Sequence, residues 1–325
     1  MWHKALAGLI GILFAFISLM TIFMGCGSTQ PISKSDFVLD TIAVIQIYDK
    51  QDRGLLDKAF ELCRKYERLF SATIATSDIG RLNRSEGKTV QVSDECFELL
   101  GKAYEYGKIT DGIFDVTIYP VSLLWDFKSG KGKPPEKEAI EEALSHVDYR
   151  QIVFEPENNG IRLKDPKAKV DLGGIAKGYI ADRIKDYLLS EGVKSAIINL
   201  GGNVLTIGAN SSGKAFRIGI QKPFSGNGEV LDSLEVIDRS VVTSGSDQRF
   251  FRYEGRLYHH ILDPRTGYPS DSGLQSVTIV SRHSLDGDAL STASFILGQE
   301  RAEELLRGLS EQGGDYEGIE ASFYP

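Results

Sequence analysis

Apolar residues along the chain follow two different spacings. Residues 37–48 (FVLDTIAVIQIY) are rich in β-branched side chains and alternate at their end, which predicts a strand. Between residues 54 and 70, apolar positions recur every three or four residues, as in an amphipathic helix. A second helix is predicted over residues 93–108, because a serine is followed by Asp94 and Glu95 in the first turn.

Shorter helices and strands are predicted through the rest of the chain. In order, they are a helix over 137–144, a hairpin of 151–154 and 160–163, a loop and helix across 170–188, a buried strand over 195–200, several strands between 204 and 280, a helix from near 286 and another over 300–309. The order lacks the strict strand–helix alternation of a doubly wound sheet. We therefore expect an α+β fold.

The N-terminus has the features of an export signal. Lys4 precedes an uncharged apolar run over residues 5–24, and a small residue then leads to Cys26. The run is also long enough to span a bilayer, so an uncleaved anchor helix is an alternative. A cysteine at this place resembles the lipidated residue of bacterial lipoproteins. We expect a signal peptide over 1–25, lipidation at Cys26, a polar tether over 26–35 and one domain over 36–325, outside the cytoplasm and held at the membrane.

Charge and cysteine usage exclude some functions. The net charge of −8 and the lack of a clustered Lys/Arg surface argue against nucleic-acid binding. No CxxC motif or Cys/His cluster indicates zinc or iron–sulfur. Cys63 and Cys96 fall on predicted helices; a disulfide is an alternative, but two separate buried thiols are the preferred interpretation.

Four short segments carry candidate chemistry. Residues 170–179 (VDLGGIAKGY) place glycines at a helix start, where backbone N–H groups can approach a phosphate, although close packing would explain them equally. Residues 199–203 (NLGGN) follow a strand, as a tight turn also would. Residues 259–269 (HHILDPRTGYP) put two histidines beside a turn, as candidate bases or structural residues. Asp288 and Thr292 share one helix face and are hard oxygen ligands suited to Mg²⁺, a pattern that is also common by chance.

Taken in order, these segments resemble the ApbE family of FAD:protein FMN transferases, which are bacterial flavin-transferring lipoproteins. Three further segments strengthen the resemblance: residues 71–83 (S-x-x-x-x-x-S-x-I-x-R-L-N), FDVT at 114–117 and TSG at 243–245. The resemblance covers nearly the whole predicted mature chain. It implies a single ApbE-like, T-fold-type domain of mixed helices and largely antiparallel sheets.

The resemblance also implies roles for individual residues. Mg²⁺ would be held by Asp288, Thr292 and the backbone carbonyl of Gly174, and His260 would be the base for the incoming hydroxyl. FMN would be joined by a phosphoester to a Ser or Thr of an acceptor protein, with release of AMP. The residues implied for the FAD site are Leu39, Thr73, Phe114, Asp115, Asp171, Lys177 and Ile261.

The implied acceptor carries an Asp-Gly-x-Gly-Ala-Thr/Ser-like motif and belongs to a membrane redox complex or is an extracytoplasmic flavoprotein. The chain departs from the family pattern at some positions. Leu39-Asp40-Thr41 stands where Met-Gly-Thr is common, Asp247 replaces an aromatic residue, and Thr73 occupies the place of a tyrosine that packs on the nucleotide. Two other functions therefore stay open: a Mg²⁺-dependent FAD pyrophosphatase that gives FMN and AMP, and a lipid-anchored FAD-storage protein.

Overall fold

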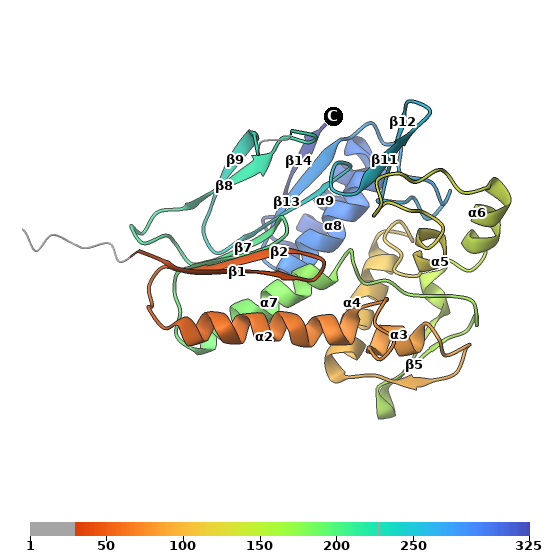
Figure 1. Cartoon of the computed structure of the whole chain (residues 1–325). Helices are drawn as coiled ribbons and strands as arrows, with labels where there is room; N and C mark the ends of the chain where they lie inside the picture. The colour runs from red at the N-terminus through yellow and green to blue at the C-terminus, as the bar shows by residue number, and fades with distance from the viewer. Residues whose placement is uncertain (1–29, 226–227) are drawn as a thin grey trace, which may run out of the picture.

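The computed structural model describes residues 30–225 and 228–325. Its centre is a seven-stranded sheet in which every neighbouring pair is antiparallel (Figure 1). In spatial order the strands are β1 (Ile32–Val38), β2 (Thr41–Ile47), β6 (Ala196–Leu200), β7 (Asn203–Ile207), β10 (Ser240–Gly245), β13 (Ser276–Ser281) and β14 (Glu320–Tyr324). The predicted α+β class with largely antiparallel sheets is confirmed.

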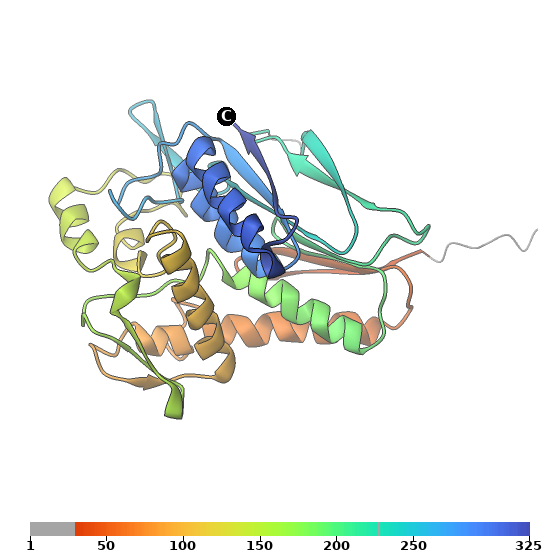
Figure 2. The same cartoon turned by 180° about the vertical axis from the view of Figure 1, so that it is seen from behind.

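Helices cover one face of this sheet, and a separate hairpin covers part of the other (Figures 1 and 2). The helices are α2 (Arg53–Phe70), α7 (Ala176–Ser190), α8 (Ser284–Leu297) and α9 (Gln299–Gln312). Their apolar faces join the main core with the inward residues of the strands. The hairpin of β8 (Phe216–Gln221) and β9 (Val230–Val236) buries Phe216, Ile218 and Val236 against Val204 and Val241 of the sheet.

A smaller lobe lies beyond one end of the sheet (Figure 1). It contains α3 (Asp78–Leu82), α4 (Asp94–Ile109), α5 (Tyr119–Ser122), α6 (Lys137–Leu144) and a sheet of β3 (Val90–Gln91), β5 (Gly160–Leu163) and β4 (Ile152–Glu155). The hairpin of β11 (Phe250–Tyr253) and β12 (Arg256–His259) packs on it through stacked rings of Trp125, Phe127, Phe251 and Tyr258. The Trp125 indole N–H also donates to the Gly267 carbonyl at 3.1 Å, which fixes the loop after β12.

The structure corrects two of the predicted boundaries. Residues 37–48 are not one strand but the end of β1, a tight turn and β2; Leu39 and Asp40 form the turn with φ of 57° and 59°. Left-handed conformation at both positions suits a short hairpin turn, yet apolar residues on both sides hide the turn in the sequence. Strand β1 begins at Ile32, so residues 32–35 belong to the fold and not to the tether.

Other expectations from the sequence have different outcomes. Cys63 and Cys96 are separate, buried, free thiols, as preferred. Strand β14 was not predicted.

The signal peptide at 1–25 and the lipidation site Cys26 lie outside the described residues. Within residues 30–225 and 228–325, no helix has the length and apolar character needed to cross a bilayer.

Candidate active site

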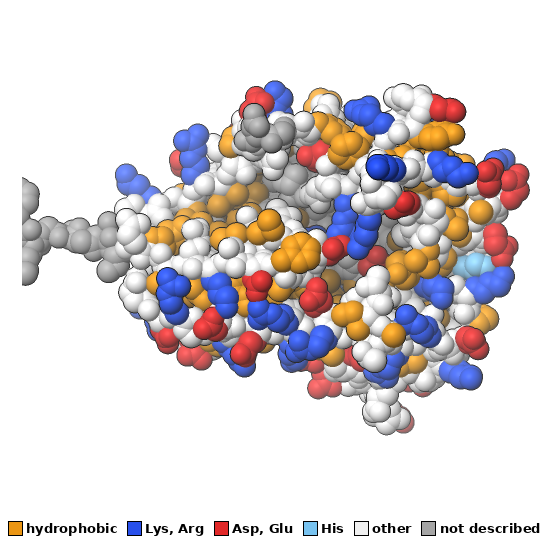
Figure 3. Space-filling view, in the orientation of Figure 1, with side chains coloured by type: hydrophobic (Ala, Val, Ile, Leu, Met, Phe, Trp, Pro, Cys, Tyr) orange, Lys and Arg blue, Asp and Glu red, His pale blue; other side chains and the backbone are white. Residues whose placement is uncertain are grey.

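A cavity of about 1380 Å³ opens where the sheet meets the smaller lobe. On the outside, acidic and basic side chains meet around its mouth in the middle of the face shown in Figure 3. Every residue predicted for the FAD site, the metal and the base lines this cavity: Leu39, Thr73, Phe114, Asp115, Asp171, Gly174, Lys177, His260, Ile261, Asp288 and Thr292. Segments far apart in the sequence thus converge on one place.

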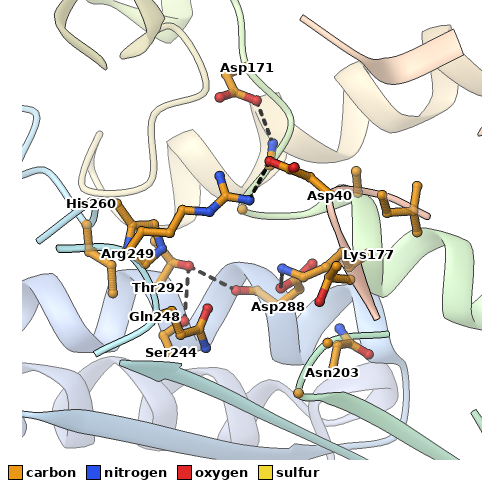
Figure 4. A pocket seen from close by; sticks show the side chains of 18 of the residues that line it. Asp40, Asp171, Lys177, Asn203, Ser244, Gln248, Arg249, His260, Asp288 and Thr292 are labelled. Carbon is orange, nitrogen blue, oxygen red and sulfur yellow. Dashed lines mark hydrogen bonds and ion pairs between the residues drawn. The ribbon is translucent and has the colours of Figure 1, made fainter. Parts of the chain in front are cut away.

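Asp288 and Thr292 project into the cavity from successive turns of α8 (Figure 4). The Asp288 side chain is buried, and its Oδ2 accepts the backbone N–H of Gly178 at 2.9 Å. Its other oxygen, Oδ1, lies 3.7 Å from the Lys177 ammonium. The Thr292 hydroxyl donates to the Asp288 carbonyl at 3.3 Å and lies 3.3 Å from the Ser244 hydroxyl. These oxygens are therefore fixed by α7, α8 and β10 together.

Two glycines allow α7 and the loop before it to approach α8 this closely. A Cβ on Gly178 would lie 2.3 Å from the Ser284 carbonyl oxygen, so only glycine fits there. A Cβ on Gly174 would lie 3.2 Å from the Phe114 ring and 3.7 Å from the Thr292 hydroxyl. Asp182 of α7 accepts the backbone N–H groups of Ser284 and Leu285 at 2.8 and 2.9 Å, and so caps α8 from its neighbour.

The donor groups at this junction suit Mg²⁺ as a partial protein site. A carboxylate, a hydroxyl and a backbone carbonyl are hard oxygen ligands, and Mg²⁺ commonly takes one or two carboxylates with water and substrate phosphate. In the part of the chain that the structure describes, no group of three or more His, Cys, Asp and Glu side chains could hold a metal by itself. Asp288, Thr292 and Gly174 therefore fit a Mg²⁺ ion whose remaining ligands are water and substrate phosphate.

His260 and His259 have different environments although they are adjacent. The His259 Nε2–H donates to the Ser270 carbonyl at 3.1 Å and the ring stands edge-on to Phe295, so this histidine is structural. His260 lines the cavity, and its Nδ1 is buried with no hydrogen-bond partner among the described residues. Burial, with the nearby charge of Arg249, lowers the pKa of His260 to about 3. The imidazole is therefore neutral at physiological pH.

The two aspartates predicted at the FAD site differ in their engagement. Asp171 Oδ1 accepts the backbone N–H of Gly173 at 2.9 Å, and burial raises the pKa of its carboxyl. Asp115 accepts from the Thr117 N–H and hydroxyl at 2.8 and 2.6 Å, and from the Tyr149 N–H at 2.9 Å. Both Asp115 oxygens hold the loop that carries Phe114. In this conformation Asp115 is a positioning residue at the cavity wall.

The other predicted residues lie around the cavity walls and mouth. Phe114 and Ile261 are buried, whereas Leu39 sits in the β1–β2 turn and donates its N–H to Glu67 Oε1 at 2.9 Å. The Thr73 hydroxyl is 3.0 Å from that of Ser71.

Some charged residues that line the cavity were not predicted for the site. Among them are Asp40 of the turn, Lys128 and Arg249, which are joined by ion pairs through Asp40. The sequence offered one signal for this group, because Asp40 stands where the family that the chain resembles commonly has glycine.

The ApbE family model matches residues 39–314, nearly the whole described chain. The chain belongs to the ApbE family. It is 37% identical over 276 residues to an FAD:protein FMN transferase of Klebsiella pneumoniae strain 342, covering 85% of each chain. It is 31% identical to one of Treponema pallidum, covering 94% of this chain and 89% of the relative.

Solved structures agree with this assignment. The ApbE protein of Thermotoga maritima superposes with a TM-score of 0.82 at 31% identity, over 90% of this chain and 94% of the other. The fold is thus a single ApbE-type α+β domain, and its curated relatives are transferases. The chain is accordingly an enzyme of the transferase class.

Proposed function

We propose that this chain is a Mg²⁺-dependent FAD:protein FMN transferase, which moves the FMN half of FAD onto a Ser or Thr hydroxyl of an acceptor protein and releases AMP. The observation that carries the proposal is the convergence in one cavity of the oxygen donors of α8, the Gly174 loop and the neutral His260. The names of the relatives, FAD:protein FMN transferases, support the substrate and the reaction.

The chain's own residues suit each part of the transfer. The acceptor hydroxyl would bond to the FMN-side phosphorus while the bridging P–O bond to AMP breaks, and the hydroxyl proton would pass to His260. Bound Mg²⁺, held by Asp288, Thr292 and the Gly174 carbonyl, would supply charge neutralisation at the diphosphate. Positioning is the main requirement of such a transfer. It would be met by the α7–α8 junction and by the loop that Asp115 holds.

Substrate binding would strengthen the base. The positive charges of Arg249 and Lys177 help to lower the pKa of His260, after the larger effect of burial. An anionic diphosphate beside these cations would offset their charge and raise the pKa of the imidazole toward its ordinary value. His260 would then be a better proton acceptor when FAD is bound than in the free protein.

The reaction is tested with the purified chain, FAD, Mg²⁺ and a peptide that carries Asp-Gly-Ser-Gly-Ala-Thr. We expect AMP release together with a peptide whose mass has increased by that of FMN minus one water, as a phosphoester requires. Release of AMP with free FMN would instead assign the FAD pyrophosphatase. Thr73, in place of an aromatic residue at the cavity mouth, is the feature that favours that second candidate. FAD binding without AMP would leave the storage protein.

The site assignment is tested by Asp288→Asn, which keeps an acceptor for the Gly178 N–H but removes the charge. We expect loss of the Mg²⁺-dependent activity with the fold retained. Asp186→Asn is the matched control, because Asp186 lies on α7 but is exposed and paired with Arg183 outside the cavity. Full activity in Asp288→Asn would refute the assignment of Asp288 to the metal.

Export and anchoring belong to the same proposal. The apolar run at residues 5–24 and the cysteine that follows it support a lipoprotein at the outer surface of the cell membrane. The acceptor would then be a membrane redox subunit or an extracytoplasmic flavoprotein. Mass spectrometry of the mature N-terminus should find a lipidated Cys26, and Cys26→Ser should leave the membrane fraction. An unmodified, intact N-terminus in the membrane fraction would favour the anchor helix.

A further inference from the structure

Three segments are tied together across the mouth of the cavity by one carboxylate. Asp40 Oδ2, in the β1–β2 turn, is 2.8 Å from Arg249 Nη2 and 2.9 Å from Lys128 Nζ. Arg249 immediately precedes β11, and Lys128 lies in the loop between α5 and α6. All three residues line the cavity. Figure 4 shows the Arg249 side chain crossing from beside His260 to Asp40.

The two cations serve the interior of the cavity as well as its rim. Burial is the main cause that lowers the pKa of His260, and the charge of Arg249 adds to it. Burial raises the pKa of Asp171, and the charges of Arg249 and Lys128 oppose that shift. A planar guanidinium with an ammonium beside it is a common arrangement for binding phosphate oxygens. The Asp40 carboxylate neutralises this pair from the outside.

The bonds that Asp40 makes are of a kind that a ligand can replace. The side chains of Asp40, Arg249 and Lys128 are 50%, 42% and 69% exposed. Such exposed ion pairs shift equilibria by only about 1.5- to 5-fold each. Asp40 also has φ of 59°, a left-handed conformation that suits glycine better than an L-residue with a side chain. The paired arrangement of Asp40 with Arg249 and Lys128 is therefore only slightly more stable than one in which these ion pairs are broken.

We propose that Arg249 and Lys128 bind a phosphate group of the diphosphate substrate, and that the Asp40 carboxylate occupies them until the substrate binds. This inference rests on the proposed function and adds two binding residues and one competitor to it. Substrate phosphate replaces Asp40 as the counter-ion of Arg249. The ion pairs between the β1–β2 turn and the opposite wall are then broken.

Equilibrium binding to the intact chain without acceptor tests the exchange. The probes are FAD, ADP, which carries a diphosphate without flavin, and riboflavin, which carries flavin without phosphate. Asp40→Asn removes the charge, and Asn tolerates the left-handed backbone. We expect it to bind FAD and ADP about 3- to 10-fold more tightly than the parent, from two exposed pairs. Riboflavin should bind equally to both proteins.

Two further variants separate competition from a structural effect. Asp40→Gly repeats the measurement with the residue that best suits the turn, should Asp40→Asn misfold. Asp57→Asn is the matched control, because Asp57 forms a similar ion pair with Lys34, at 2.6 Å, away from the cavity. It should leave the binding of all three probes unchanged.

A double-variant cycle identifies the partners of Asp40. Arg249→Gln combined with Lys128→Gln should weaken FAD and ADP binding, and adding Asp40→Asn to that background should then have no effect. The proposal is overturned if Asp40→Asn weakens or does not change ADP binding, if it changes riboflavin equally, or if its effect persists without the two cations. No FAD binding by the parent would overturn the proposed function instead, and the ADP series would still decide the role of Asp40.

Discussion

The contact between α7 and α8 at Gly178 is the part of the site whose perturbation can be worked out most fully. In Gly178→Ala the new Cβ would lie 2.3 Å from the Ser284 carbonyl oxygen and 2.6 Å from Leu285 Cα. Ordinary heavy-atom contacts lie near 3.5–4.0 Å, so the helices must separate by about 1 Å. The start of α8 cannot simply bend away, since Asp182 binds its first N–H groups.

This separation should lower the stability of the protein and disturb the position of Asp288. Overpacking of this kind costs about 1–3 kcal/mol, and each kcal/mol lowers Tm by roughly 2–4 °C in a domain of 150–250 residues. The hydrogen bond from Gly178 N–H to Asp288, at 2.9 Å, would lengthen at the same time. Hydrogen bonds to charged groups contribute about 1.5–3 kcal/mol. The Asp288 carboxylate would also move relative to the Gly174 carbonyl, because these groups lie on opposite sides of the helix contact.

The assay combines thermal unfolding with Mg²⁺ titration of AMP release. We expect a lower Tm for Gly178→Ala and a higher Mg²⁺ concentration for half-maximal activity. Gly101→Ala and Gly308→Ala are matched controls on α4 and α9, since an added Cβ meets nothing within 4 Å at either position. They should keep the parent's Mg²⁺ dependence and gain up to about 1 kcal/mol of stability. A Gly178→Ala protein with the parent's Tm and Mg²⁺ dependence would refute the reasoning.

Two other predictions concern buried titratable groups. The pKa of His260 is lowered from its ordinary value to about 3, so the unfolded chain takes up this proton first, and stability is lost as the pH falls from about 6.5 toward 3. Urea unfolding of His260→Gln should therefore lose less stability than the parent on acidification, by roughly 2–3 kcal/mol at pH 4.5; parallel pH curves would contradict this. Burial raises the pKa of the Cys63 thiol to about 12 and that of Cys96 well above its usual range, so alkylation mapped by mass spectrometry should modify both only after unfolding. Modification of either thiol in the native protein would show that its helix opens locally.

Helices with strong local signals could be predicted from the sequence nearly to the residue. Ser93 caps α4 by accepting the Cys96 N–H, and α6 has its predicted bounds. The β1–β2 hairpin could not be predicted in the same way. Its turn residues Leu39 and Asp40 are not the Asn-Gly type that marks such turns, and the sheet around them determines their conformation. Tertiary context overrides local preference there.

Most of the cavity lining could be assigned from motif order, but not what each side chain binds. Residues 259–269 contain two histidines with the same local sequence signals. Only the fold shows that His259 is bonded to Ser270 and that His260 faces the cavity. Asp115 belongs to a recognisable motif and was predicted to contact FAD. In the structure its carboxylate accepts hydrogen bonds from backbone N–H groups instead. Hydrogen-bond partners distant in sequence decide such roles, and no local pattern encodes them.

The ion pairs at the mouth of the cavity also depend on contacts between segments that are distant in the sequence. Asp40, Lys128 and Arg249 come from separate segments, and no short sequence motif links them. Only the antiparallel hairpin, the lobe loop and the segment before β11 bring them within hydrogen-bond distance. Because the pairs are half-exposed, they contribute little to stability. Their position over the cavity instead makes them suited to exchange partners when an anionic substrate arrives, which a buried and fully satisfied ion pair would resist.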